Sequence, residues 1–336
     1  MMIDFAILVL AGLATAMFGL PMKHFRNWRW EHIWIGQALS SNILFPVVTA
    51  IAYWHVLADV IHATPITRLL IIFLSGAVWG LGGIGYGMSL VLLGLSFTYS
   101  VLFSITTLLG ALIPIWVGWE QRSEHVDWFF LGLATCVIGT IVLGSAASRR
   151  DREGNGQEQN ALLMPIPELP FAWTLLIALA GGVFSACMGL SMAANASLVN
   201  RALENGASQV LAPLVVWLPL NLGSATVALA YGSWCCSRSS SFKDLYQQHP
   251  IRNWGLVLLM GGLGFGGLLA YGFGESGKNH PAVNEAWAIF MASFILSGNV
   301  IGWFTGEWRN SNSQTVVRMI AGVVLLLSAI GFLAVR

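Results

Sequence analysis

The feature that most constrains this chain is a series of ten predominantly apolar stretches separated by short polar connections. Each has the roughly 17 to 25 residues that a helix needs to cross about 30 Å of hydrocarbon. We therefore predict ten membrane-spanning helices, near residues 4–21, 33–57, 66–92, 96–118, 127–146, 171–194, 207–231, 253–274, 284–304 and 315–335. The first stretch lacks a basic segment before it, so it is expected to be a retained helix, not a cleaved signal.

Composition agrees with an integral membrane protein. Hydrophobic residues make up 56% of the 336 residues and charged residues only 9%, against about 25% charged in soluble domains. The net charge of +1 gives no reason to expect a nucleic-acid partner. Four cysteines show neither metal-ligand spacing nor a disulfide framework, so no metal and no cofactor is expected.

The distribution of Lys and Arg predicts the orientation, because cationic residues are retained on the cytoplasmic side. Eleven of the sixteen fall in the odd-numbered connections, and the other five fall in the termini and even-numbered connections. Both termini are therefore expected outside an inner membrane. The polar stretch Ser148–Asn160 lacks apolar periodicity and is typical of a flexible cytoplasmic linker.

The two halves of the chain contain related motifs. Spans one and six share A-x-x-G-L-x-M, which ends at Met22 and at Met192, and spans three and eight contain the glycine-rich segments Gly76–Gly87 and Gly261–Gly272. An odd number of helices per repeat inverts the second copy, as in many secondary transporters. We predict a 5+5 inverted repeat, with residues 1–147 and 171–336 as the two repeats and 148–170 as the linker.

Glycines in span three recur on one helical face, at positions 76, 80, 83 and 87. Small residues let membrane helices approach closely, so this face is expected to be either a packing groove or a bendable border of a cavity that also presents Trp79 and Tyr86. Trp79 and Trp217 fall near mid-span, where an indole N–H needs a partner or a cavity. The tryptophans near span ends are typical of interfacial anchors: Trp28, Trp30, Trp34, Trp54, Trp119, Trp128, Trp234, Trp254, Trp303 and Trp308.

Polar residues within the spans mark where water or a hydrophilic solute could enter. They include Tyr99 and Ser104 in span four, Asn195 after span six, and Asn284 in span nine. With aromatic platforms and almost no charge at mid-span, the pattern suits a neutral polyhydroxylated solute. The alternative for the Ser and Thr residues is hydrogen bonding to the carbonyls of their own helix.

Two carboxyl groups lie close to the predicted membrane core. Glu275 follows span eight, and Glu285 opens span nine. Either could carry a coupling proton, because burial favours the neutral form of a carboxyl group. The alternative for Glu285 is a helix N-terminus, where the dipole stabilises carboxylates.

The sequence resembles the L-rhamnose-proton symporters of the drug/metabolite transporter superfamily. The resemblance covers nearly the whole chain and rests on Pro21–Trp34, the Gly76–Ser96 segment, Phe184–Met192 and the Glu307-Trp308 pair. It implies a ten-helix inner-membrane carrier that imports L-rhamnose, or a related deoxysugar, with protons. The chain departs from the family pattern at Glu275, where a His is usual, and at Glu285, where an Asp is usual.

These observations combine into one hypothesis. A cavity bordered by spans one, three, four, six, eight and nine would bind the sugar, and alternating access would expose it to each side in turn. The expected substrate-binding residues are Trp79, Tyr86, Tyr99, Ser104, Asn195, Tyr271, Asn284 and Trp287, with Glu285 or Glu275 for the proton and Glu31, beside Arg29, as a cytoplasmic gate.

Three other functions compete with this hypothesis. A superfamily exporter, or a carrier of another small polar metabolite, is the nearest. A cationic-drug exporter usually needs a deeply buried carboxylate. An intramembrane enzyme would need a nucleophile with a base, or a metal-binding motif, and neither is present in the sequence. A structural or receptor subunit would leave the duplication without a mechanical purpose.

Overall fold

The computed structural model describes residues 2–93, 98–117, 126–150, 153, 170–275, 283–306, 308–309 and 311–334. Within these residues the fold is all-helical. The side chains of Tyr99, Glu275 and Asn284 lie outside what the structure describes, and so does most of the predicted linker 148–170.

The first half of the chain builds the elements α1 (Met2–Met17), η1 (Leu20–His24), α2 (Trp30–Gln37), η2 (Ala38–Leu44), α3 (Phe45–Ala52), α4 (Trp54–Ala63), α5 (Ile66–Leu93), η3 (Tyr99–Phe103), α7 (Ser104–Trp116) and α8 (Val126–Arg150). The second half builds α9 (Phe171–Ala194), α10 (Ala196–Glu204), α11 (Leu214–Ser239), α12 (Asp244–Gln247), α13 (Pro250–Glu275), α14 (Val283–Phe304) and α15 (Ser313–Leu333).

Among the described residues, nine segments are helical, long and apolar enough to cross a membrane. They correspond to nine of the ten predicted spans. The remaining one, span four, is represented by the shorter apolar helix Val101–Trp116. This agrees with an integral membrane protein.

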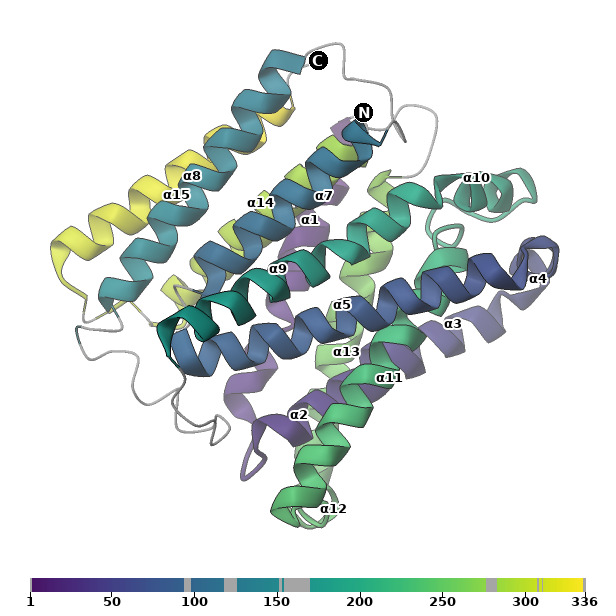
Figure 1. Ribbon diagram of the computed structural model, residues 1–336, viewed down its shortest axis with the longest axis horizontal. Helices are drawn as coiled ribbons and strands as arrows, with labels where there is room; N and C mark the ends of the chain where they lie inside the picture. The colour runs from purple at the N-terminus through teal and green to yellow at the C-terminus, as the bar shows by residue number, and fades with distance from the viewer. Residues whose placement is uncertain are drawn as a thin grey trace.

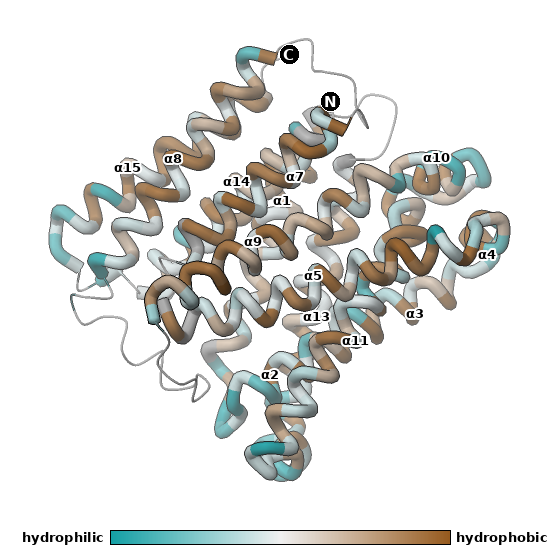
Figure 2. Tube along the Cα trace, in the orientation of Figure 1, coloured by the Kyte–Doolittle hydropathy of each residue, from teal (hydrophilic) through white to brown (hydrophobic). Residues whose placement is uncertain are grey.

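The helices form one bundle with two polar ends. In Figure 1 both chain termini, α4 and α10 lie along one end of the bundle, and α12 lies at the other. Figure 2 shows hydrophilic segments gathered at these two ends and hydrophobic residues along the helices between them. The bundle therefore has the polarity that a bilayer requires, with an apolar band between two polar surfaces.

Helix contacts pair distant parts of the chain. α1 packs against α13 and α14, α9 packs against α5 and α7, and α8 packs against α15. α5 also packs along α11. The centre of the bundle is thus built by both halves together, whereas α8 and α15 form a pair along one side (Figure 1).

The second span is not a regular α-helix. Residues Ala38–Leu44 form a π-helix, and Pro46 follows directly in α3. A proline has no N–H to donate to the carbonyl four residues before it, here that of Asn42, so the backbone adopts a wider turn. A second π-helix, η3, opens span four. Such π-helical turns often occur at functional sites because they redirect side chains.

Candidate functional site

A cavity of about 180 Å³ lies where the central helices meet. This volume suits a small solute, since a single buried water needs only about 10 to 15 Å³ by a comparable measure. α1, α5, η3, α7, α9, α13 and α14 all contribute to its wall, and α2, η2 and α11 do as well. Spans two and seven, which the predicted border of spans one, three, four, six, eight and nine did not include, therefore belong to the wall as well.

One wall of the cavity is polar. Asn42 in η2 donates from Nδ2 to Ser224 Oγ in α11 at 3.2 Å, which joins spans two and seven. Asn42 Oδ1, Trp34 Nε1 and Thr15 Oγ1 are buried atoms of residues that border the cavity, and they have no hydrogen-bond partner among the described residues. Buried polar atoms are nearly always paired with protein or water. These three atoms are therefore one acceptor, one donor and one hydroxyl close to the cavity whose hydrogen-bonding capacity is unmet among those residues.

Other parts of the cavity wall are aromatic. Trp79 and Tyr86 of α5 and Trp287 and Phe290 of α14 border the cavity. Trp287 is fixed by its surroundings, because Nε1 donates to the Thr106 carbonyl at 3.2 Å and the ring lies over a glycine of α9. Flat aromatic faces of this kind can stack on the C–H face of a sugar ring.

No Asp, Glu, Lys, Arg or His belongs to the cavity wall in the described part of the chain. The same residues contain no group of three or more His, Cys, Asp or Glu that could hold a metal ion. The cavity can therefore offer hydrogen bonds and stacking but no opposing charge, which suits a neutral solute.

The predicted substrate-binding residues fall into three groups. Trp79, Tyr86 and Trp287 line the cavity together. Ser104, Asn195 and Tyr271 are buried but lie elsewhere in the bundle. Tyr99 and Asn284 have side chains outside the described set.

Asn195 has a different environment from the one expected. It lies at the break between α9 and α10 and accepts a hydrogen bond at Oδ1 from Arg68 Nε at 2.8 Å. Arg68 also donates from Nη2 to Ser197 Oγ at 2.9 Å. Because Arg68 belongs to the first turn of α5, these bonds tie α5 to the α9–α10 corner at the end of the bundle where the termini lie.

The predicted proton-coupling residues lie near the same end. Glu285, in the first turn of α14, is only 7% exposed and precedes the cavity residue Trp287 by two positions. The Glu275 side chain lies outside the described residues. A second buried carboxyl group, Asp4 in the first turn of α1, was not singled out from the sequence.

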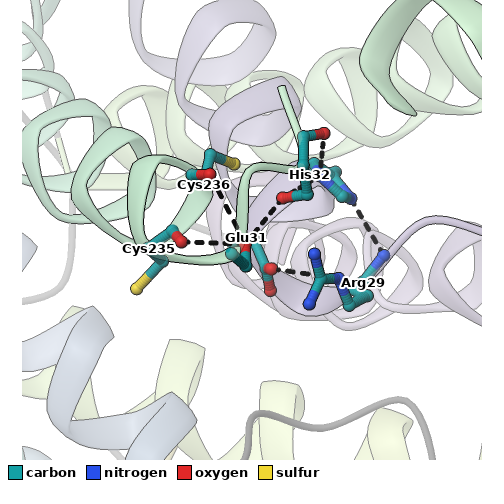
Figure 3. Close-up of polar contacts among 7 residues, drawn as sticks. Arg29, Glu31, His32, Cys235 and Cys236 are labelled. Carbon is teal, nitrogen blue, oxygen red and sulfur yellow. Dashed lines mark hydrogen bonds and ion pairs between the residues drawn. The ribbon is translucent and has the colours of Figure 1, made fainter. Parts of the chain in front are cut away.

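Glu31, the predicted cytoplasmic gate, lies in the first turn of α2, and Figure 3 draws its polar contacts. Its carboxylate is 3.2 Å from Arg29 Nε, and the residue is 4% exposed. The neighbouring His32 accepts at Nδ1 from the Arg29 backbone N–H, and its Nε2 lies 3.0 Å from both oxygens of Ser241. The start of α2 is therefore joined to the segment that follows α11.

Four tryptophans contradict their prediction as interfacial anchors. Trp28, Trp30, Trp34 and Trp308 are 0, 3, 8 and 4% exposed, so they are buried in protein and do not face the membrane interface. Trp34 in particular belongs to the cavity. Its closeness to a predicted span end concealed this, and the polar residues that follow it, Ser41 and Asn42, were the sequence signal that could have revealed it.

An apolar helical bundle around an uncharged cavity, lined by aromatic and other apolar residues with a few polar side chains among them, defines a membrane carrier of a small solute. The particular family follows from comparison with known proteins. The model of the L-rhamnose-proton symport protein family matches residues 1–335 of this chain. The chain belongs to this family and is a transporter, not an enzyme.

Individual relatives agree over almost their whole length. The L-rhamnose-proton symporter of Pectobacterium atrosepticum is 27% identical over 331 residues, which cover 94% of this chain and 92% of that protein. Those of Klebsiella pneumoniae subsp. pneumoniae and Escherichia coli O1:K1 are each 25% identical and cover 96% of this chain and 94% of their own lengths.

Proposed function

We propose that this protein imports L-rhamnose, or a related deoxysugar, together with protons across the inner membrane. The relatives named above are L-rhamnose-proton symporters, and the chain belongs to their family. The observation that carries the proposal is the uncharged cavity with polar and aromatic walls. A neutral sugar needs hydrogen bonds and stacking surfaces. A charged residue in the wall would have to lose water on sugar binding without gaining an oppositely charged partner, which costs free energy.

The helix contacts support a ten-helix inverted repeat of 5+5. If spans one to five correspond to spans six to ten, then α1 against α13 and α14 is the counterpart of α9 against α5 and α7, and all of these contacts are present. In the same comparison α8 and α15 are counterparts of each other, so the contact between them is its own counterpart. Two inverted halves that share a central site can exchange conformations, which is the geometry of alternating access.

The charges support an orientation with both termini outside. Arg29, Arg150, Arg238, Lys243 and Arg252 belong to helix ends or connections at the α12 end of the bundle. Because cationic residues are retained in the cytoplasm, we assign this end to the inside. The cavity residues Trp34 and Tyr86 then belong to the cytoplasmic half of their helices.

In this mechanism the sugar lies between the two walls. Its hydroxyls bond to Asn42, Trp34 and Thr15, and its apolar face stacks on Trp79, Tyr86 or Trp287. Hydrogen bonds between neutral groups contribute about 0.5 to 1.5 kcal/mol each. Three such bonds contribute about 1.5 to 4.5 kcal/mol, which together with one stacking contact is of the order of the roughly 4 kcal/mol that millimolar affinity requires.

The coupling proton is assigned to Glu285, with Glu275 as the second candidate. Glu285 does not border the cavity, so its protonation acts on the sugar through α14, whose next turn carries Trp287 and Phe290. The sugar must bind the protonated carrier more tightly than the deprotonated one, or the proton gradient could not drive accumulation.

The test is L-rhamnose uptake into proteoliposomes under an imposed proton gradient, with sugar counterflow measured in the same preparations. We expect the wild type to concentrate the sugar and Glu285→Gln to show counterflow only. Equal accumulation by both would show that the coupling proton binds at another residue, and Glu275→Gln is then the variant to measure. The proposed function fails if the wild type neither binds nor transports L-rhamnose.

A further inference from the structure

Residues at corresponding positions of the two halves line the cavity in pairs. The span-one and span-six motifs are 170 residues apart, and this offset pairs Thr15 with Ser185 and Phe18 with Met188; all four border the cavity. The Gly76 and Gly261 segments are 185 residues apart, which pairs Trp79 with Gly264 and Gly83 with Leu268. These four also border it.

Spans two and seven share a further pattern, W-x-x-x-x-L-x-S. It begins at Trp34 in span two and at Trp217 in span seven, and its serines, Ser41 and Ser224, both border the cavity. Each tryptophan also lies beside a glycine of the next span in its own half, although these two glycines are not counterparts of each other. A Cβ on Gly83 of α5 would lie 2.9 Å from the Trp34 ring, and one on Gly272 of α13 would lie 2.9 Å from Trp217 Nε1.

Two pairs of identical aromatic residues break the symmetry of the cavity. Trp34 and Tyr86 border it, but their counterparts Trp217 and Tyr271 do not, and both counterparts are 0% exposed. Trp34 and Tyr86 lie in the half of the bundle towards α12. Trp217, near the start of α11, and Tyr271, near the end of α13, lie towards the termini. The pair that borders the cavity and the pair that is buried therefore lie towards opposite sides of the membrane.

The buried pair lies directly behind the cavity wall. Tyr271 contacts Trp217 with ring centroids 6.2 Å apart, Trp287 at 5.9 Å and Phe290 at 4.8 Å. Trp287 and Phe290 themselves border the cavity. A small outward movement of α14 relative to α11 and α13 would expose the Trp217 and Tyr271 rings to the solute without rebuilding the fold.

Trp217 also has an unmet hydrogen-bonding group. Its Nε1 is buried and has no partner among the residues that the structure describes, and the same holds for Trp34 Nε1. A buried indole N–H normally finds a partner. For Trp34 the cavity can supply one. For Trp217 a partner becomes available only if this region opens.

We propose that Trp217 and Tyr271 are a second substrate-contacting wall, the counterpart of Trp34 and Tyr86, which lines the cavity when it opens to the outer side. The proposal rests on the proposed function, because it requires alternating access. In the cytoplasm-facing state the sugar contacts Trp34 and Tyr86. In the outward-facing state these two become buried, and Trp217 and Tyr271 take over the contact.

The first test is labelling of single cysteines by a membrane-impermeant maleimide. Tyr271→Cys and Tyr86→Cys are made in a carrier whose four native cysteines are replaced by serine and which retains uptake. We expect Tyr271→Cys to react from the outer side and Tyr86→Cys from the cytoplasmic side. Ala329→Cys, in the contact between α8 and α15 and 0% exposed, is the unreactive control.

The outcomes separate this proposal from the proposed function. If Tyr271→Cys does not react from the outer side while the parent carrier takes up L-rhamnose, the second wall is wrong and the transport function stands. If the wild type does not take up L-rhamnose, the proposed function fails in the uptake assay, which is read independently of labelling.

The second test keeps the side chains large, so that loss of folding does not obscure the result. Trp217→Phe removes the indole N–H, and Trp34→Phe does so on the other side. We expect Trp217→Phe to raise the half-saturation concentration for sugar on the outer side about five-fold, the equivalent of one neutral hydrogen bond. Trp34→Phe should raise the half-saturation concentration for sugar on the cytoplasmic side. Equal changes on both sides for each variant would indicate a purely structural role and overturn the proposal.

Discussion

Two positions of the glycine face on α5 make different contacts, although they belong to the same sequence pattern. Towards the termini, Gly76 lies against the backbone of Leu220, and Gly223 of α11 lies against the backbone of Phe73. Backbone meets backbone there, and neither glycine borders the cavity. Two turns further on, Gly83 borders the cavity and leaves room for the Trp34 ring.

This difference shows what a small residue in a membrane helix can do. At one end it allows two helices to approach, which stabilises the bundle in the absence of a hydrophobic driving force between helices. At the other end it leaves space for a large side chain that itself forms a wall of the site. The packing-groove and cavity-border interpretations of this face therefore both hold, at different positions.

Gly76→Ala should have the largest effect, because it disrupts the close-packed end. An added Cβ would collide with the Leu220 carbonyl, and a backbone atom cannot move aside as the end of a side chain can. We expect a loss of about 3 kcal/mol or more, at or above the upper end for overpacking. Thermal stability of the purified carrier in detergent measures it. Gly266→Ala on α13, where a Cβ meets nothing within 4 Å, should be neutral or slightly stabilising.

Gly83→Ala tests the cavity end and should have a smaller effect on folding. Its Cβ would lie 2.9 Å from Cζ2 of Trp34, so the ring must shift. We expect roughly tenfold weaker L-rhamnose binding, about 1.4 kcal/mol, with most of the thermal stability retained. Titration calorimetry on the detergent-solubilised protein measures the affinity. Ser75→Ala, on the exposed face of the same helix, should bind as the wild type does. Unchanged affinity in Gly83→Ala would contradict the role given to Trp34.

Arg68→Gln should have a smaller effect again. Arg68 ties the first turn of α5 to Asn195 and Ser197, and exposed contacts of this kind contribute about 0.2 to 1 kcal/mol. Weakening them should favour the outward-facing state and roughly halve the half-saturation concentration for sugar on the outer side. Sided uptake assays measure this. Arg201→Gln, on the exposed side of the nearby α10, is the control, and an equal response in both variants would argue against a specific tie.

The smallest effect concerns the opposite end of the bundle. Glu153 accepts from the Asn312 backbone N–H at 2.9 Å and from Thr315 Oγ1 at 2.8 Å, and these bonds lower the pKa of its carboxyl from 4.5. A lowered pKa means that the stabilisation is present above pH 4.5 and is lost as pH falls through the lowered value. The melting temperature of wild type should exceed that of Glu153→Gln slightly at neutral pH. The difference should shrink at acid pH; a constant difference would show that the carboxylate bonds do not contribute.

Much of the site could be anticipated from residue types, and the remainder depended on neighbours that are distant in sequence. Trp79, Tyr86 and Trp287 were predicted because large aromatics stand out among glycines and apolar residues. Trp34 was misassigned because a tryptophan near a span end is usually an interfacial anchor. Asn195 was predicted to bind sugar, but its side-chain oxygen accepts a hydrogen bond from Arg68, more than a hundred positions away.

The sequence by itself determined the membrane class, nine of the long apolar helices, the repeated motifs and the scarcity of charge at mid-span, because hydrophobicity, length and repeated motifs are local properties of the chain. Only the tertiary structure decided that spans two and seven border the cavity, that Asn42 and Trp34 belong to its wall, and which tyrosine of a repeated pair faces it. Tyr86 and Tyr271 sit in nearly the same local sequence. What distinguishes them is which helices pack around them, and packing between distant segments is not encoded in either segment alone.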